Sequence, residues 1–256
     1  MNQSSQKVTF TGALREPLSA RIDWPVGGAP KAFALFAHCF SCGIDLSTVS
    51  RISRALSEEN IALFRFDFTG IGSSGGDFAN TNFSSNVQDL IAASQFMSQQ
   101  FTPPQILLGH SLGGAAVLSA AEHIPSANAI ATIGAPFAVN HVEHLFAHAL
   151  EDIRQQGQAK VQIADRTFTI KKQFLDDLEQ QTIVDKIGRL KRALLVMHSP
   201  VDEVVSIDNA RRIYEAAKHP KSFISLDDAD HLLLKSPKDS AYVARVLAAW
   251  SSRYIQ

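Results

Sequence analysis

Short apolar runs alternate with longer amphipathic segments along this chain of 256 residues. The apolar runs have the length of strands and are hydrophobic almost throughout, which is typical of strands covered on both faces of a parallel sheet. The pattern predicts such strands at Ala32–Ala37, Ile61–Phe66, Ile106–Gly109, Ile130–Ile133, Ala193–His198 and Lys221–Leu226. It also predicts a leading hairpin from Val8–Phe10 and Ala20–Asp23, with its turn at Glu16–Pro17.

The segments between these runs carry apolar residues at three- and four-residue spacing, which predicts helices. The predicted helices are Thr48–Glu59, Ser85–Gln100, Leu112–His123, Ile207–Lys218 and Ser240–Tyr254. Strands that alternate with helices indicate βαβ units. The predicted fold class is therefore α/β, with a doubly wound and mostly parallel eight-stranded sheet.

One segment interrupts this alternation. About 60 residues separate the strand ending at Ile133 from the strand starting at Ala193, far more than a simple crossover needs. Within it the pattern predicts a helix at Asn140–Gln156, a hairpin at Lys160–Ile170 around Ala164–Arg166, and a helix at Lys171–Leu178. We interpret the segment as a small cap inserted at about residues 137–188 of a single domain spanning 1–256.

Composition and charge argue against a nucleic-acid-binding protein and against a membrane protein. Lys and Arg total 24 and Asp and Glu total 25, mixed along the chain, so a nucleic acid is not an expected partner. The first residues, MNQSSQKVTF, lack the features of a signal peptide, and no apolar stretch has the length of a membrane span. We therefore expect a cytoplasmic protein that does not act at a membrane.

The main chemical motif is Gly109-His110-Ser111-Leu112-Gly113, directly after a predicted strand and directly before a predicted helix. That context is the one required of a nucleophile elbow, a sharp turn that exposes a serine at the carboxyl end of the sheet. The alternative is a glycine-rich turn with no chemistry. The flanking strand and helix favour Ser111 as a catalytic nucleophile.

A serine hydroxyl needs an adjacent base, and in this kind of fold the acid and the histidine follow the serine in that order. Asp202 follows the strand ending at His198, and His231 follows the last predicted strand. The spacing favours Asp202 over its neighbour Glu203. We expect the remaining histidines to lie in helices, turns or the inserted segment, and His198 to be structural.

The tetrahedral intermediate of acyl transfer needs two N–H donors. One is expected from Leu112, the residue after the nucleophile, and the other from the loop after the third strand. In that loop we favour Phe40, with Cys39 as a close rival, because a backbone donor leaves little trace in the sequence.

Two further motifs have competing interpretations. The glycine-rich stretch from Arg65 to Gly76 resembles a dinucleotide loop, but no helix follows at once, and we expect a structural loop held by Asp67. Cys39 and Cys42 form a C-x-x-C motif, for which we favour two small buried thiols. The alternatives are a redox pair and a metal site, although a second pair of ligands at suitable spacing is absent. A disulfide there would be expected to distort the oxyanion hole and switch activity off.

The chain resembles a known family over nearly its whole length, through segments that include LFAHCFSC, FRFDFTGIGSSGGDF, LLGHSLGGAAVL, HSPVDEVV and DADHLL. It looks like bacterial α/β hydrolases that are often fused to a C-terminal domain of the osmotically inducible, peroxide-reducing type. This chain stops at Gln256, so the resemblance carries over no activity of that domain. The core is also similar to cinnamoyl and feruloyl esterases, which share the pattern F-D-F-x-G-x-G-x-S. Cys39 departs from the common pattern, in which glycine follows the histidine.

The sequence thus predicts hydrolysis of small-molecule carboxylic esters through an acyl-enzyme, with no cofactor and no metal. Thioesters, amides and lactones remain alternatives because the same triad would serve them. A non-catalytic ligand-binding protein on the same fold is a further alternative, as is an interaction module that uses the histidine-rich inserted segment.

Overall fold

The computed structural model describes residues 4–163 and 166–255. Its main sheet has eight strands in the order β1-β2-β4-β3-β5-β6-β9-β10. The strands are β1 (Ser4–Thr11), β2 (Pro17–Trp24), β3 (Ala32–Ala37), β4 (Ile61–Phe66), β5 (Ile106–His110), β6 (Ala129–Ile133), β9 (Ala193–His198) and β10 (Lys221–Ser225). Strands β3 to β6, β9 and β10 pair in parallel, whereas β1 and β2 pair antiparallel and β2 pairs antiparallel with β4. The predicted doubly wound, mostly parallel sheet is confirmed.

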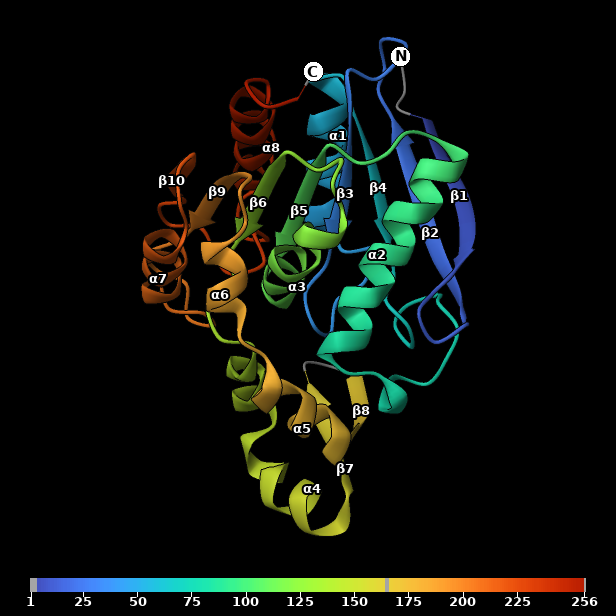
Figure 1. Ribbon diagram of the computed structural model, residues 1–256, viewed down its shortest axis with the longest axis vertical. Coiled ribbons are helices and arrows are strands. Elements are labelled where there is room, and N and C mark those ends of the chain that lie inside the picture. The colour runs from blue at the N-terminus through green and yellow to red at the C-terminus, as the bar shows by residue number, and fades with distance from the viewer. Residues whose placement is uncertain (1–3, 164–165, 256) are drawn as a thin grey trace.

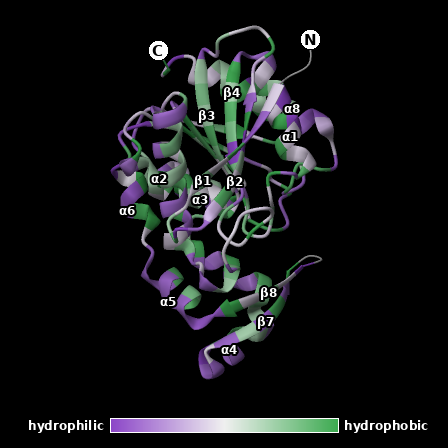
Figure 2. Ribbon diagram, turned by 90° about the vertical axis from the view of Figure 1, so that its right-hand side faces the viewer, coloured by the Kyte–Doolittle hydropathy of each residue, from purple (hydrophilic) through white to green (hydrophobic). Residues whose placement is uncertain are grey.

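Helices cover both faces of this sheet (Figure 1). On one face lie α1 (Ser47–Glu58) and α8 (Pro237–Ser251), and on the other lie α2 (Phe83–Gln100), α3 (Leu112–Ala120), α6 (Ile183–Gly188) and α7 (Asp208–Ala216). Each face has its own apolar cluster, so the central strands are buried on both sides. Figure 2 shows this as a predominantly hydrophobic β3 and β4. Burial on both faces explains why the central strands are near-continuous apolar runs in the sequence.

The insertion between β6 and β9 leaves the sheet and lies beyond the carboxyl ends of the parallel strands (Figure 1). It consists of the 3₁₀ segment η3 (Val139–Ala149), α4 (Leu150–Gln156), the hairpin β7 (Gln158–Ile163) and β8 (Arg166–Lys171), and α5 (Lys172–Gln180). The chain then returns to the face of the sheet through α6, which packs against α3 and α7. The single helix predicted at 140–156 is interrupted, because Phe146 has non-helical backbone angles. The predicted hairpin turn falls partly on residues 164 and 165, outside the described residues. Helix α6 was not predicted.

Polar contacts attach the insertion to the start of α2. The Ser84 N–H donates to Asp177 Oδ2 over 2.9 Å, and Gln173 Nε2 donates to the Thr81 carbonyl over 2.7 Å. The short 3₁₀ turn η1 (Phe78–Asn80) lies beside β8. The insertion is thereby held over the loops that follow β3 and β4.

A buried ion pair ties the antiparallel edge of the sheet to its parallel part. Arg65 Nε on β4 lies 2.7 Å from Asp23 Oδ2 on β2, and both side chains are almost fully buried. Ser53 Oγ of α1 donates to the same carboxylate oxygen over 2.6 Å. The guanidinium also donates to the Ile44 carbonyl, so the pair holds the loop after β3 as well.

Asp23→Ala is expected to lower the free energy of unfolding by about 3 kcal/mol, because it leaves the Arg65 charge buried without its partner. Urea unfolding followed by circular dichroism would measure the change. The matched control is Asp45→Ala, whose exposed pair with Arg21 spans 3.2 Å and is expected to contribute less than about 1 kcal/mol. Equal losses in the two variants would contradict the importance assigned to the buried pair.

Candidate active site

Ser111 occupies a strained turn between β5 and α3. Its backbone angles are φ 55° and ψ −126°, a conformation that non-glycine residues rarely adopt. Its N–H donates to the Ile133 carbonyl at the end of β6 over 2.8 Å. At Gly113 an added Cβ would lie 2.4 Å from the carbonyl oxygens of both Ala37 and His38, so only glycine lets α3 start this close to the loop after β3. The predicted nucleophile elbow has the required local geometry.

Asp202 and His231 meet across two loops. Asp202 follows β9 and His231 follows β10, its neighbour in the sheet, and His231 Nδ1 lies 2.7 Å from Asp202 Oδ2. The other carboxylate oxygen accepts the N–H groups of Val204 and Val205, both over 2.9 Å. Burial opposes ionisation of Asp202, but the hydrogen bonds from His231 and from these backbone groups outweigh it and hold the pKa of the carboxyl below its ordinary value. Glu203 is exposed and takes no part.

The turn at Ser111 adjoins this pair through Gly134. Gly134 is the residue after Ile133, whose carbonyl accepts the Ser111 N–H, and its φ is +54°. A Cβ at Gly134 would lie 3.2 Å from both Asp202 Oδ2 and His231 Nδ1. Serine, histidine and aspartate from three separate loops therefore gather at one edge of the sheet.

His110, which sequence reasoning left among the unremarkable histidines, also belongs to this site. Its Nε2 lies 2.7 Å from the His231 carbonyl and must donate, since a carbonyl oxygen only accepts. Burial, assisted by the nearby His231, lowers the pKa of His110 to about 3, so the ring is neutral near pH 7. Thr48 Oγ1 holds the next carbonyl, that of Leu232, over 2.6 Å. The only hint in the sequence was the position of His110 beside the nucleophile.

His198 is structural, as expected, and it supports the turn that carries Asp202. It ends β9, is fully buried, and donates from Nε2 to the Val205 carbonyl over 2.7 Å. The same nitrogen lies 3.6 Å from Asp202 Oδ2. Burial lowers the pKa of His198, so a neutral ring shapes the turn that presents Asp202.

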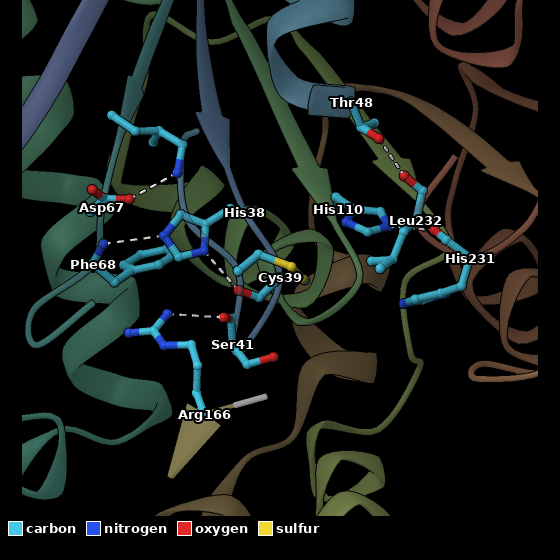
Figure 3. The surroundings of a disulfide bond; sticks show 12 residues. His38, Cys39, Ser41, Thr48, Asp67, Phe68, His110, Arg166, His231 and Leu232 are labelled. Atoms are coloured by element: carbon cyan, nitrogen blue, oxygen red, sulfur yellow. Dashed lines mark hydrogen bonds between the residues drawn. A yellow bond between two sulfur atoms is a disulfide. The ribbon is translucent and has the colours of Figure 1, made fainter. Parts of the chain in front are cut away.

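The loop after β3 is held from several sides (Figure 3). His38 Nε2 accepts the Phe68 N–H over 3.3 Å, so His38 Nδ1 carries the proton and donates to the Cys39 carbonyl over 2.7 Å. Burial lowers the pKa of His38 and keeps it neutral. Asp67 accepts the N–H groups of Ile44 over 2.8 Å and of Ser73 over 3.1 Å, which confirms its predicted role in holding the glycine-rich loop.

Neither candidate donor in this loop has an acceptor among residues 4–163 and 166–255. Cys39 and Phe40 are both buried, and within the described part of the chain their N–H groups make no hydrogen bond. Buried backbone N–H groups without partners are rare in folded proteins. Phe40 and Leu112 line the same small cavity, of about 10 Å³, together with residues such as Gly113, Phe68 and Asn86.

The prediction of two free thiols is wrong. Cys39 and Cys42 are joined in a disulfide, with their Cα atoms 5.2 Å apart. The physical reason is a tight turn, in which the Cys42 N–H donates to the Cys39 carbonyl over 3.3 Å and brings the two side chains together.

The aromatic residues of the insertion pack mainly on one another and on Phe40. Phe146, Phe168 and Phe174 are buried, and their ring centroids lie 5.4–6.5 Å from that of Phe40. They form the apolar core of the insertion. Phe137 is half-buried instead, with the Arg212 guanidinium 4.2 Å from its ring centroid.

No helix among the described residues is long and apolar enough to cross a membrane. Over the same residues, no cluster of three or more His, Cys, Asp or Glu side chains is arranged to hold a metal ion.

Solved structures resemble this one over nearly their full length. The esterase domain of a Rhodothermus marinus protein is 46% identical, with a TM-score of 0.81, and the match covers 99% of this chain and 100% of that one. Est1E from Butyrivibrio proteoclasticus, solved with ferulic acid, is 16% identical with a TM-score of 0.78, covering 97% and 99% of the two chains. At that identity the second match shows a shared fold only.

Among curated proteins, the uncharacterized protein YfhR of Escherichia coli K12 is 22% identical over 206 residues, which are 80% of this chain and 66% of YfhR. YfhR of Salmonella typhi is 24% identical over 231 residues, covering 89% of this chain and 75% of that protein. This chain thus spans slightly less than two thirds of the length of the Escherichia coli relatives.

The family model described as serine aminopeptidase, S33, matches residues 29–180, which include β3 to β6, the turn at Ser111 and much of the insertion. The sheet order and the solved structure with 46% identity agree with that match. The protein therefore has the α/β-hydrolase fold and belongs to the serine aminopeptidase S33 family.

Proposed function

We propose that this protein hydrolyses carboxylic esters of small molecules through an acyl-enzyme, with Ser111 as nucleophile, His231 as base and Asp202 as acid. The observation that carries the proposal is the His231–Asp202 hydrogen bond of 2.7 Å beside a serine with φ 55°. Nucleophilic catalysis requires an accessible serine and an oriented acid–base pair, and here Ser111 is strained and partly exposed while the His231 and Asp202 side chains are buried.

The steps follow from this geometry. His231 Nδ1 donates to Asp202, which leaves Nε2 free to take the proton from Ser111 as its oxygen attacks the ester carbonyl. The N–H groups of Leu112 and Phe40 stabilise the oxyanion. His231 then protonates the departing alcohol, and a water molecule repeats the sequence on the acyl-enzyme. Asp202 fixes the histidine tautomer and stabilises its charged form.

The free N–H groups of the loop after β3 support the oxyanion assignment. Phe40 and Leu112 line one cavity, and the Phe40 N–H has no acceptor among the described residues. The insertion packs on Phe40, so we further propose that it acts as a cap over the acyl or alcohol side of the site.

Cleavage of N-terminal amino acids is the second candidate, because the family is described as serine aminopeptidase. Such an enzyme needs an anionic group to bind the substrate ammonium. The cavity beside Leu112 has no carboxylate among its described lining residues, which are mostly apolar. The similarity to the esterase domain from Rhodothermus marinus, which is 46% identical, favours esters.

Ser111→Ala is expected to lower kcat on p-nitrophenyl esters, from acetate to decanoate, on the order of 10⁴-fold or more because the nucleophile is lost. Ser98→Ala, on an exposed position of α2, is the matched control and should keep wild-type activity. If the wild type does not cleave any of these esters, or hydroxycinnamoyl esters, but cleaves thioesters or amino acid p-nitroanilides, the substrate class is wrong. Equal rates for wild type and Ser111→Ala would contradict the mechanism.

His110→Leu is expected to lower kcat roughly tenfold with little change in KM, because it removes the donor that fixes the His231 backbone without touching substrate. His110→Gln keeps an N–H donor near the position of Nε2 and is expected to recover most of the loss. Steady-state kinetics on p-nitrophenyl acetate would separate the two parameters. A loss of the same size in both variants would argue against the hydrogen bond as the cause.

Acidification is expected to destabilise the fold through its buried histidines. The pKa of His110 is about 3 in the folded chain, so between about pH 6 and pH 4 only the unfolded chain takes up that proton, and stability falls as pH falls. His38 and His198 act in the same direction. Urea unfolding at several pH values would give the slope of the free energy of unfolding against pH. In His110→Gln this slope should be smaller than in the wild type by about 1.4 kcal/mol per pH unit. His123→Gln, at an exposed position, should keep the wild-type slope.

A further inference from the structure

The disulfide between Cys39 and Cys42 lies in the loop that carries the proposed oxyanion donor (Figure 3). Nothing in ester hydrolysis requires a disulfide at this place. Cys39 is buried and lines the cavity shared by Phe40 and Leu112, whereas Cys42 is partly exposed. The bond thus joins the interior of the site to the protein surface.

The disulfide closes the turn that orients one particular peptide. The carbonyl of Cys39 accepts the His38 Nδ1–H over 2.7 Å and the Cys42 N–H over 3.3 Å. In a trans peptide the N–H points opposite to the carbonyl. The Phe40 N–H, which belongs to the same peptide, is therefore directed away from His38 and has no acceptor in the part of the chain that the structure describes.

We propose that the Cys39–Cys42 disulfide is a reversible redox site that sets esterase activity, with the disulfide form active and the dithiol form weakened. The proposal rests on the proposed function. The sequence led us to expect that a disulfide would distort this loop, but the contacts of the Cys39 carbonyl favour the opposite effect. The bond holds residues 39 and 42 together and so keeps the Phe40 N–H preorganised for the oxyanion. Without it the two sulfur atoms move apart to non-bonded contact, the turn widens, and the donor loses alignment.

The redox step is ordinary thiol–disulfide exchange with an external thiol. A thiolate attacks the sulfur of Cys42, the Cys39–Cys42 bond breaks, and Cys39 leaves as a thiolate that takes up a proton. A second external thiolate attacks the external sulfur of the mixed disulfide and releases Cys42, which is also protonated. Two thiols are oxidised to one disulfide as the protein disulfide is reduced to two thiols. In the cytoplasmic location predicted from the sequence, protein disulfides are typically transient and redox-sensing.

The test compares oxidised and reduced wild type on p-nitrophenyl acetate. The protein is reduced with dithiothreitol and desalted without oxygen, and free thiols are counted with Ellman's reagent. Reduction is expected to lower kcat roughly tenfold, less than complete loss of an oxyanion donor would, with KM little changed. Reoxidation with oxidised dithiothreitol should restore kcat. Ser111→Ala treated in parallel corrects for cleavage of the ester by thiols.

A Cys39→Ser, Cys42→Ser double variant should have the kcat of the reduced wild type and no response to dithiothreitol. If it does not fold, the two states of the wild type decide the question alone. Equal kcat in both states, a higher kcat after reduction, or a bond that dithiothreitol does not reduce in the folded protein would each overturn the proposal. Absence of ester turnover in every form would instead contradict the proposed function.

Discussion

The left-handed backbone at Ser111 is the constraint on which the site depends. Strand β5 must turn into α3 within one residue, and the helix must start almost in contact with the carbonyls of Ala37 and His38. That contact sets the distance between the serine turn and the loop after β3. The hydrogen bond from the Ser111 N–H to Ile133 then fixes the turn against β6 and against Gly134, which touches Asp202 and His231. The cost of one strained residue is offset by packing that fixes all the surrounding loops.

Three buried histidines support loops of the site in the same way. His38, His110 and His198 are buried, and each donates to one backbone carbonyl in a loop of the site: those of Cys39, His231 and Val205. Burial lowers the pKa of all three, so they stay uncharged near pH 7. A neutral donor can brace a loop without adding positive charge beside the imidazolium that His231 would form during catalysis. The loop after β3, the segment of His231 and the turn that carries Asp202 are thus each supported by an imidazole.

Phe40 connects two parts of the protein. Its backbone lies in the loop after β3, while its ring packs against the aromatic core of the insertion. Arg166 of β8 reaches the same loop through the Ser41 carbonyl, over 3.3 Å. The aromatic residues of the insertion therefore form its core and also support the loop beside the small cavity. Substrate size and the position of the insertion are expected to be linked through this one residue.

The sequence alone determined the strands, the helices on the sheet and the positions that follow each strand, because strands covered on both faces are continuously apolar and helices repeat every three or four residues. It also indicated Ser111, Asp202 and His231, since each stands in the segment that follows a predicted strand. The tertiary structure decided what depends on contacts between distant segments. The roles of His110 and His198 come from single hydrogen bonds across loops. Helix α6 is short, and its position is set by packing against α3 and α7. The disulfide between Cys39 and Cys42 depends on the path of one turn. Periodicity reports which face of an element is buried, but it does not report which atoms the folded chain brings within hydrogen-bonding or bonding distance.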